Sequence, residues 1–404
     1  MKLKLVFVID CLIMGFMVGV IAALFLTVVD FLINFVWVAV PAFVHAPTYY
    51  PLIVGLIGGG LVGIFQRRLA GYPRTIDETI EEFKTANKIN YKRDLPRNFI
   101  MAIIVLTFGA SLGPEAALAS ILGGLISWIG DRMKLTMIRR NELLDLGIGA
   151  MMSAIFYAPL VGVSKSFEKK SVSDQFSSKS RKISLYAITT IAGISGFTLI
   201  RYIVPKETVF AIRMPAVVWD SKVLLVILPA LLVGIAFGYL FQLFEKISGI
   251  IAAQINRPVL LAVLAGLLIG ILGMISPYFL FSGEHEVFKF SHEVTTLGLP
   301  LILTIAVGKA LLTNLCFAFG WRGGKIFPII FSSTAMGFAF ANLFSYTPGL
   351  IVSIVVAASV TIVVKQPYVT GALLLLLFPI QFFPFIMAAC LVTNKFTKIV
   401  NEFK

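Results

Sequence analysis

The chain has 404 residues, of which 58% are hydrophobic and 13% charged, with a formal net charge of +14 at pH 7. Its mean hydropathy of +0.95 excludes an ordinary water-soluble domain and predicts an all-α polytopic membrane protein. The basic residues lie mainly in short loops, where the positive-inside rule places them, so they do not indicate nucleic-acid binding. The cysteines, Cys11, Cys316 and Cys390, all lie in apolar runs. We therefore expect neither a disulfide framework nor a metal site nor a cofactor.

Apolar segments suited to crossing about 30 Å of hydrocarbon recur along the chain. They cover 4–29, 51–66, 98–110, 141–163, 183–204, 221–243, 250–281, 297–319 and 347–396. The first has the basic start of a signal peptide, but its apolar part is too long for one, so we expect a membrane helix that is retained. No soluble domain of ordinary size fits between these segments. We therefore expect one transmembrane domain over 1–404 in the cell membrane.

Two loops carry most of the positive charge. Loop 67–97 has eight basic and five acidic residues, and much of it has the pattern of a short amphipathic helix. Loop 165–182 is serine-rich and basic and is expected to be a flexible connector. The positive-inside rule places both on the cytoplasmic side.

Glycine and proline interrupt the apolar segments at four places. The breaks are "GASLGPE" (109–115), "YAPLVG" (157–162), "GWRGGKIFP" (320–328) and "KQPYVTG" (365–371). Backbone that leaves a helix at membrane depth has to be buried in protein or line a wet cavity, so the breaks indicate a pathway.

The order of the breaks resembles an internal repeat. Their prolines are 45 residues apart in the first pair and 39 residues apart in the second. Matching interruptions are typical of transporters whose site lies where two repeats meet. We expect a first half of about 1–205 and a second half of about 220–404. The alternative is that glycine and proline are simply common in membrane helices.

Glu115 is the single carboxylate in "GASLGPEAALASILGGL", residues 109–125. Gly113 permits a turn, Pro114 suits the first position of a helix, and Glu115 then falls in the first turn of a helix that runs to about residue 130. Such a first turn offers unpaired N–H groups and the positive end of the helix dipole, which attract anions. An ionised Glu115 would compete there with a permeating anion and would release the site when protonated. The alternative is a carboxylate that only caps its own helix.

These motifs resemble those of the CLC family of chloride channels and anion/proton exchangers. "GASLGPEAALASILGG" is similar to the family's G-R-E-G-P pore motif, with Gly113 and Glu115 at the glycine and the gating glutamate, while Pro114 replaces the arginine and Ala117 the proline. Three further stretches resemble family motifs in the same order: "FYAPLVGVSKSFEK" (156–169), "LCFAFGWRGGKIFP" (315–328) and "KQPYVTGALLLLL" (365–377). The resemblance covers about 70–396 and is to a divergent bacterial-type member without C-terminal regulatory domains.

The resemblance implies an inverted repeat of broken and tilted helices that transports small inorganic anions and has no enzyme activity. Chloride is the first expectation, with fluoride and nitrate as alternatives, in a lipid-embedded homodimer with one pore in each subunit. Glu115 would be the gate, and both channel and proton-coupled antiporter remain open. The resemblance places the anion-selecting positions at Gly113, Pro114, Ala116, Gly324, Lys325, Ile326, Phe327 and Pro328.

Around the gate the sequence departs from the family pattern. The stretch "GYPRTIDE" (71–78) has Arg74 where the family has a pore serine, either as an anion ligand or as an ordinary arginine at the cytoplasmic mouth. The pore tyrosine is expected near 378–380, where the chain reads "FPI". The second, proton-carrying carboxylate falls at Lys169, with Glu168 one residue earlier. On a helix that offset turns the side chain by about 100°, which argues against proton coupling.

Other ionisable residues leave further alternatives. Lys325 either adds positive charge beside an anion or extends to the interface, and Lys309, inside an apolar run, is expected to pair with a carboxylate or to face a wet cavity. "SGEHEVFKFSHEV" (282–294) fits a solvated extracytoplasmic loop better than a metal site. A degenerate CLC-like assembly or regulatory protein remains a second hypothesis. A membrane-embedded enzyme is a third, but no HExxH, paired-aspartate or nucleophile–histidine pattern supports it.

Overall fold

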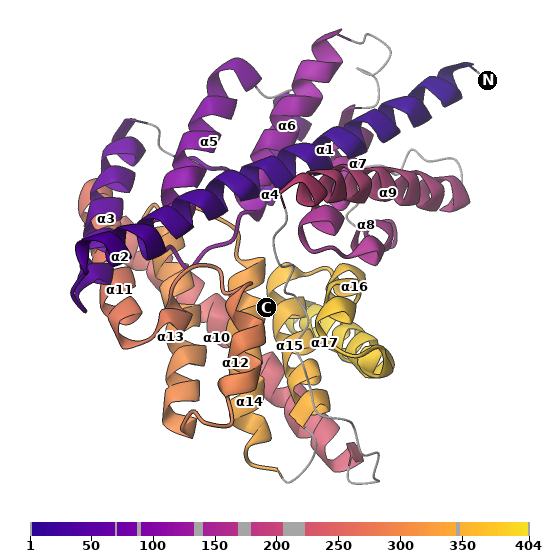
Figure 1. Cartoon of the computed structure of the whole chain (residues 1–404). Helices are drawn as coiled ribbons and strands as arrows, with labels where there is room; N and C mark the ends of the chain where they lie inside the picture. The colour runs from indigo at the N-terminus through magenta and orange to yellow at the C-terminus, as the bar shows by residue number, and fades with distance from the viewer. Residues whose placement is uncertain are drawn as a thin grey trace.

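The structure is a computed structural model that describes residues 2–68, 71–86, 90–132, 140–168, 179–204, 223–344 and 348–402. Within these ranges the polypeptide is almost entirely helical. Figure 1 shows most of the helices up to α9 on one side of the molecule and most of those from α10 onward on the other. The expected boundary between halves, near 205–220, lies outside the described residues.

The helices follow one another closely along the chain. Before residue 205 they are α1 (Lys2–Asn34), the π-helical turn η1 (Phe35–Ala39), α2 (Val40–Val44), α3 (Tyr50–Arg68), α4 (Ile76–Ala86), α5 (Tyr91–Thr107), α6 (Glu115–Arg132), α7 (Arg140–Ile155), α8 (Pro159–Lys165) and α9 (Lys179–Ile203). After residue 222 they are α10 (Val223–Ile255), α11 (Pro258–Ile275), the 3-10 turn η3 (Pro277–Phe279), α12 (Glu286–Glu293), α13 (Leu299–Ala318), α14 (Ile326–Ala341), α15 (Pro348–Val364), α16 (Pro367–Leu377), the 3-10 turn η4 (Ile380–Phe382) and α17 (Phe383–Glu402).

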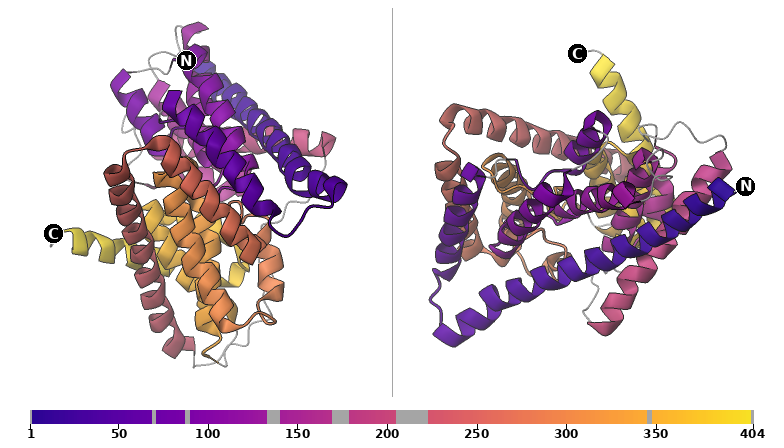
Figure 2. Two further views of the ribbon diagram at one scale, coloured as in Figure 1. Left: turned by 90° about the vertical axis from the view of Figure 1, so that its left-hand side faces the viewer. Right: turned by 90° about the horizontal axis from the view of Figure 1, so that it is seen from above.

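Seven helical segments of the described residues are long and apolar enough to cross a membrane. They are Val6–Val44, Tyr50–Arg68, Ser180–Ile203, Leu225–Ile255, Pro258–Ile275, Leu299–Ala318 and Ile380–Glu402. Large apolar side chains project from their outer surfaces, among them Tyr202, Leu225 and Leu228. Such a surface is compatible with hydrocarbon and not with water. The predicted multi-pass membrane protein is confirmed, and Figure 2 shows α1 running obliquely along one side of the bundle.

All four predicted breaks are confirmed. They separate α5 from α6, α7 from α8, α13 from α14 and α15 from α16. Each break contains a residue with positive φ: Gly109 at 82°, Tyr157 at 56°, Gly320 at 94° and Lys365 at 58°. This left-handed conformation turns the chain back at a helix end, so that amides of the break bond the last carbonyl groups of the helix. Proline at the first position then opens α8 and α16, where no amide donor is required.

Several expected segment boundaries were wrong. The apolar run 141–163 is two helices, α7 and α8, and the run 347–396 contains α15, α16 and most of α17. Hydropathy merged them because the breaks, at 156–158, 365–366 and 378–379, are only two or three residues long and only the second is polar. The basic loop 67–97 contains α4 and the start of α5, which confirms the amphipathic helix but shortens the loop. Loop 165–182 is bounded by the end of α8 and the start of α9, and its residues 169–178 lie outside the described ranges.

Glycine lets the long helices pack closely around a buried centre. A Cβ at Gly55 of α3 would overlap the carbonyl oxygen of Gly266 in α11, and one at Gly19 of α1 would overlap that of Gly193 in α9. Small residues at such crossings are the usual basis of close packing between membrane helices. Inside this shell α14 and α15 are buried over most of their lengths. The N-terminus of α14 therefore opens within the protein.

Candidate functional site

The first break of each half meets the other at one point. The N–H of Gly113 donates to the carbonyl oxygen of Gly324 at 2.8 Å, and the N–H of Gly324 donates to that of Gly113 at 2.7 Å. Helices α6 and α14 begin directly after this antiparallel bridge, at Glu115 and Ile326. Two helix N-termini, each with amides that have no partner within their own helix and with the positive end of a dipole, are therefore held next to each other.

The carboxylate of Glu115 lies between these two N-termini. Its side chain is 0% exposed, and Oε1 accepts a hydrogen bond from the backbone N–H of Phe327 at 3.2 Å. Phe327 lies in the first turn of α14, so the acid at the start of one helix binds the start of another. An amide hydrogen bond to a carboxylate is charge-assisted and stronger than one between neutral groups. Glu115 is thus more than a cap of its own helix.

Space for this carboxylate depends on the two bridge glycines. A Cβ built on Gly113 or on Gly324 would overlap Oε2 of Glu115. A side chain at either position would therefore require the Glu115 carboxylate to move from the place that it occupies.

Apolar groups close the site on the other sides. The ring of Phe327 stacks on that of Phe156, with centroids 4.3 Å apart and planes at 23°. Phe156 belongs to the break between α7 and α8, so a third break contributes to the site. Ala116 and Pro328 are also buried. Water is kept away from the carboxylate, which strengthens electrostatic interactions there.

Two cavities approach the buried carboxylate. The first, here the Glu168 vestibule, has a volume of about 660 Å³ and is lined by Glu168, Lys165 and Ile326 among others. The second, the His285 vestibule, has a volume of about 360 Å³ and is lined by His285, Asp30 and Pro114 among others. Pro114 precedes Glu115, and Ile326 precedes the amide that binds it. The site therefore lies between the two vestibules.

Glu168 is placed differently from the expectation that a helix would turn it away. Helix α8 ends at Lys165, so the rotation per helical residue does not apply to Glu168. Its Oε1 accepts hydrogen bonds from the N–H groups of Tyr368 at 2.7 Å and Val369 at 3.2 Å, in the first turn of α16. Burial raises the pKa of Glu168, and the two amides oppose that rise. Lys169 lies outside the described residues.

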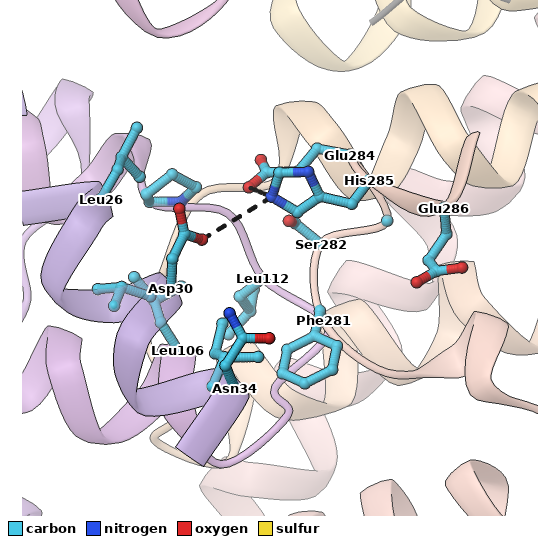
Figure 3. Close-up of a pocket in the computed structure, with 14 residues that line it drawn as sticks. Leu26, Asp30, Asn34, Leu106, Leu112, Phe281, Ser282, Glu284, His285 and Glu286 are labelled. Atoms are coloured by element: carbon cyan, nitrogen blue, oxygen red, sulfur yellow. Dashed lines mark ion pairs between the residues drawn. The ribbon is translucent and has the colours of Figure 1, made fainter. Parts of the chain in front are cut away.

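The His285 vestibule is bounded by ion pairs, as Figure 3 shows. Nε2 of His285 lies 3.9 Å from Oδ1 of Asp30 and 3.5 Å from Oε1 of Glu284, and Arg201 lies 3.7 Å from Asp30. The expected solvated loop 282–294 was wrong in part, since its second portion is the amphipathic helix α12. Among the described residues there is no group of three potential ligands that would hold a metal ion.

The two cations proposed near the anion path have other partners. The guanidinium of Arg74 pairs with Glu82 and lies 5.3 Å from the ring centroid of Tyr72. Nζ of Lys325 lies 2.8 Å from Oε1 of Glu245 and 4.1 Å from the ring centroid of Phe317. Both side chains are turned toward neighbours other than Glu115. Their roles as anion ligands stay predictions.

Lys309 has a partner that the sequence did not reveal. It is fully buried in α13, and its Nζ donates to four consecutive carbonyl oxygens, those of residues 278–281, at 2.9, 3.4, 3.2 and 2.9 Å. Its full burial contradicts the expected exposure to a wet cavity. Of the expected pairing with a carboxylate, the structure has an electrostatic interaction with Glu286, whereas the hydrogen bonds go to the carbonyl groups. Every residue has a backbone carbonyl group, so the sequence does not show which of them surround Lys309, and only the tertiary structure does.

Known proteins resemble the chain in sequence and in fold. "Putative ion-transport protein YfeO" of Salmonella paratyphi A (strain ATCC 9150 / SARB42) is 26% identical over 323 residues, 75% of this chain and 72% of that protein. The protein of the same name from Salmonella newport (strain SL254) is 27% identical over 257 residues, 60% of this chain and 58% of that protein.

Solved structures share the fold. A slow cyanobacterial Cl⁻/H⁺ antiporter matches with a TM-score of 0.79 and 19% identity, covering 97% of this chain and 94% of the other. A CLC-type fluoride/proton antiporter matches with a TM-score of 0.73 and 18% identity, covering 95% and 93%. The profile of the family described as "Voltage gated chloride channel" matches residues 54–398. With its broken helices meeting at Glu115 and this match over most of its length, the chain belongs to the voltage gated chloride channel family.

Proposed function

We propose that this chain carries small inorganic anions across the membrane along a path from the Glu168 vestibule, past Ile326 and Phe327, to the His285 vestibule. The observation that carries the proposal is the carboxylate of Glu115 bound to the amide of Phe327 at 3.2 Å. A carboxylate seated on a helix N-terminus occupies the position that suits a permeating anion. When Glu115 is protonated, its attraction to the amide weakens and an anion can replace it. The proposed function is transport and not catalysis.

The orientation of the path in the membrane is inferred from the distribution of positive charge. Lys165 lines the Glu168 vestibule, and Lys246 and Lys365 line a neighbouring cavity that shares Gln366 with it. The positive-inside rule assigns this side to the cytoplasm. The His285 vestibule then faces outward.

The test is a flux assay with the purified protein in liposomes under an anion gradient. Chloride efflux is expected from the wild type, with fluoride and nitrate as the competing substrates. Glu115→Gln removes the charge without removing the side chain and is expected to change both the rate and its pH dependence. Wild-type protein that moves none of the three anions would exclude the proposal. It would favour an assembly or regulatory protein instead.

Exchange for protons is the favoured mode. The support is Glu168, whose carboxylate lies at the vestibule on the cytoplasmic side with a pKa raised by burial. A group that gains and loses protons there is what coupling to Glu115 needs. Simultaneous recording of anion and proton movement decides the mode. Uphill proton movement driven by an anion gradient supports exchange, and anion flux without it identifies a channel.

We also propose a homodimer with a separate path in each subunit, embedded in lipid. The support is membership of the family together with the apolar outer surface, on which Leu160 of α8 and Tyr368 of α16 are half exposed. Single-molecule photobleaching of singly labelled protein in liposomes tests it. Two bleaching steps per spot are expected, and one step would contradict the dimer.

A further inference from the structure

The side chain of Lys309 ends in a cage of backbone oxygens near the middle of the membrane-spanning helix α13. Four carbonyl oxygens, those of residues 278–281, lie within hydrogen-bonding distance of Nζ and share its three N–H donors. Phe331 closes the cage, with its ring centroid 4.9 Å from Nζ. An ammonium has three N–H donors and no lone pair, so it suits a site made of acceptors and an aromatic face. A charged side chain buried in a membrane helix is costly in free energy, and such residues usually pair with other groups and serve a function.

Segment 278–281 is hydrogen-bonded to residues 108–114, here called the gate loop, which connect α5 to Glu115. The N–H of Phe281 donates to the carbonyl oxygen of Gly109 at 3.2 Å, and its ring packs edge-on against Trp37 at 5.4 Å. Trp37 in turn donates from Nε1 to the carbonyl oxygen of Thr107 at 2.8 Å. Residues 107–109 lead directly into the Gly113 bridge. The position of segment 278–281 is therefore linked to the position of the gate loop.

Helix α13 contacts the same loop a second time. The backbone carbonyl oxygen of Lys309 accepts a hydrogen bond from the hydroxyl of Thr313 at 2.8 Å. That hydroxyl lies 3.0 Å from the hydroxyl of Ser111. Phe281, the last residue of the cage, and the residues after it as far as Glu286 line the His285 vestibule together with Leu112 and Pro114 (Figure 3). Lys309 of helix α13 is thus linked both to the gate loop and to the wall of the His285 vestibule.

We propose that Lys309 is a positioning residue: its ammonium holds segment 278–281, whose last residue, Phe281, begins the wall of the His285 vestibule, and so sets anion access to Glu115 from that side. The transport consequence rests on the proposed anion function, whereas the holding of the wall does not. The chemical class that the cage binds is a primary ammonium. It follows that a small alkylammonium ion should occupy the cage when the lysine side chain is cut short.

The first experiment measures how accessible the vestibule wall is to a labelling reagent, and it does not depend on transport. Ser282, 5% exposed on the vestibule wall, is replaced by cysteine, and a membrane-impermeant maleimide is applied. The native cysteines are buried and contribute little labelling. Lys309→Met is expected to raise the labelling rate at least about tenfold, because the unheld segment opens locally. Lys289→Met, which removes an exposed lysine of α12 on the same side, is the matched control and is expected to label like the parent.

The second experiment uses the cage as a binding site. In the Ser282→Cys background, the Lys309→Ala variant is expected to react rapidly with the maleimide. Adding ethylammonium gluconate is expected to lower this labelling rate again, whereas tetramethylammonium, which has no N–H group, is expected to leave it unchanged. In liposomes at equal pH on both sides, with chloride varied against gluconate, the same ethylammonium should restore the half-saturating chloride concentration of Lys309→Ala toward the wild-type value. Ethylammonium added to wild-type protein is the control for its general effects.

The results separate the two proposals. Labelling rates in Lys309→Met and Lys309→Ala equal to the parent rate would overturn the holding role, whatever the transport result. A liposome assay in which the wild type moves no anion would overturn the proposed function and leave the labelling result standing. Should both variants aggregate, hydrogen exchange on the wild type decides. The amides of Leu280 and Phe281 must exchange as slowly as those of α13, and exchange at loop rates overturns the role.

Discussion

The carboxylate of Glu115, the first residue of α6, accepts a hydrogen bond from the backbone N–H of Phe327, in the first turn of α14, at 3.2 Å. The two residues are 212 positions apart in the chain, and the Gly113–Gly324 bridge brings their helices together. A single buried acid thereby occupies the N-terminus of a helix that belongs to the other half of the chain. The first prediction concerns this contact.

Glu115→Gln is expected to abolish most of the pH dependence of anion flux, because glutamine cannot ionise. Glu115→Ala, which also removes the side chain from the Phe327 amide, is expected to give faster flux that is independent of pH. Chloride efflux from liposomes between about pH 4 and pH 8, a range that spans titration of an ordinary and a strongly raised carboxyl, is the measurement. Unchanged pH dependence in both variants would show that the gate lies elsewhere.

Gly324→Ala places a methyl group where Oε2 of Glu115 lies. Overpacking of this kind costs about 1–3 kcal/mol, and we expect a lower thermal unfolding temperature in detergent together with altered flux. In the Glu115→Ala background the same substitution should cost much less, because the clashing atom is gone. Gly249→Ala is the control, since a Cβ at that position of α10 meets no atom within 4 Å. Additive effects of the two substitutions would contradict the steric argument.

Glu168→Gln tests the carboxylate at the N-terminus of α16. Because burial raises the pKa of Glu168, its ionisation is less favourable in the folded than in the unfolded protein, so stability is lost as the pH rises through the raised pKa. The Gln variant should therefore gain stability over the wild type at high pH and match it more closely at low pH. If protons are exchanged, the variant should retain anion flux and lose proton movement. Glu402→Gln, at the exposed end of α17, is the control.

Lys325 and Glu245 provide a test of charge near the proposed cytoplasmic end of the anion path. Glu245→Gln releases the ammonium from its partner at 2.8 Å and is expected to lower the half-saturating anion concentration modestly. Lys325→Met is expected to raise it, and the double variant should resemble Lys325→Met. Because the side chain of Glu245 is 52% exposed, solvent screens the pair, and we expect it to contribute no more than about 1 kcal/mol to stability. Identical anion affinities in all three variants would exclude Lys325 from the path.

The sequence was most informative where the residue type by itself determines the local chemistry or the backbone conformation. Glu115 was recognisable because an acid in an apolar run is rare and costly, and the four breaks were recognisable because glycine and proline determine backbone conformation. The extents of the membrane helices were less predictable. Short buried helices such as α15 and α16 are separated by only two residues, Lys365 and Gln366, so hydropathy averaged over a longer window does not separate them.

By itself, then, the sequence determined that the chain is a helical membrane protein with interrupted helices and an acid at one helix start, because composition, glycine, proline and charge act locally. Only the tertiary structure decided that Glu115 binds Phe327, that Glu168 follows the end of α8 and caps α16, and that Lys309 is held by carbonyl groups. These partners are backbone N–H and C=O groups, which every residue carries. Which of them lies next to a given side chain depends on how distant helices pack, and residue types do not encode that directly.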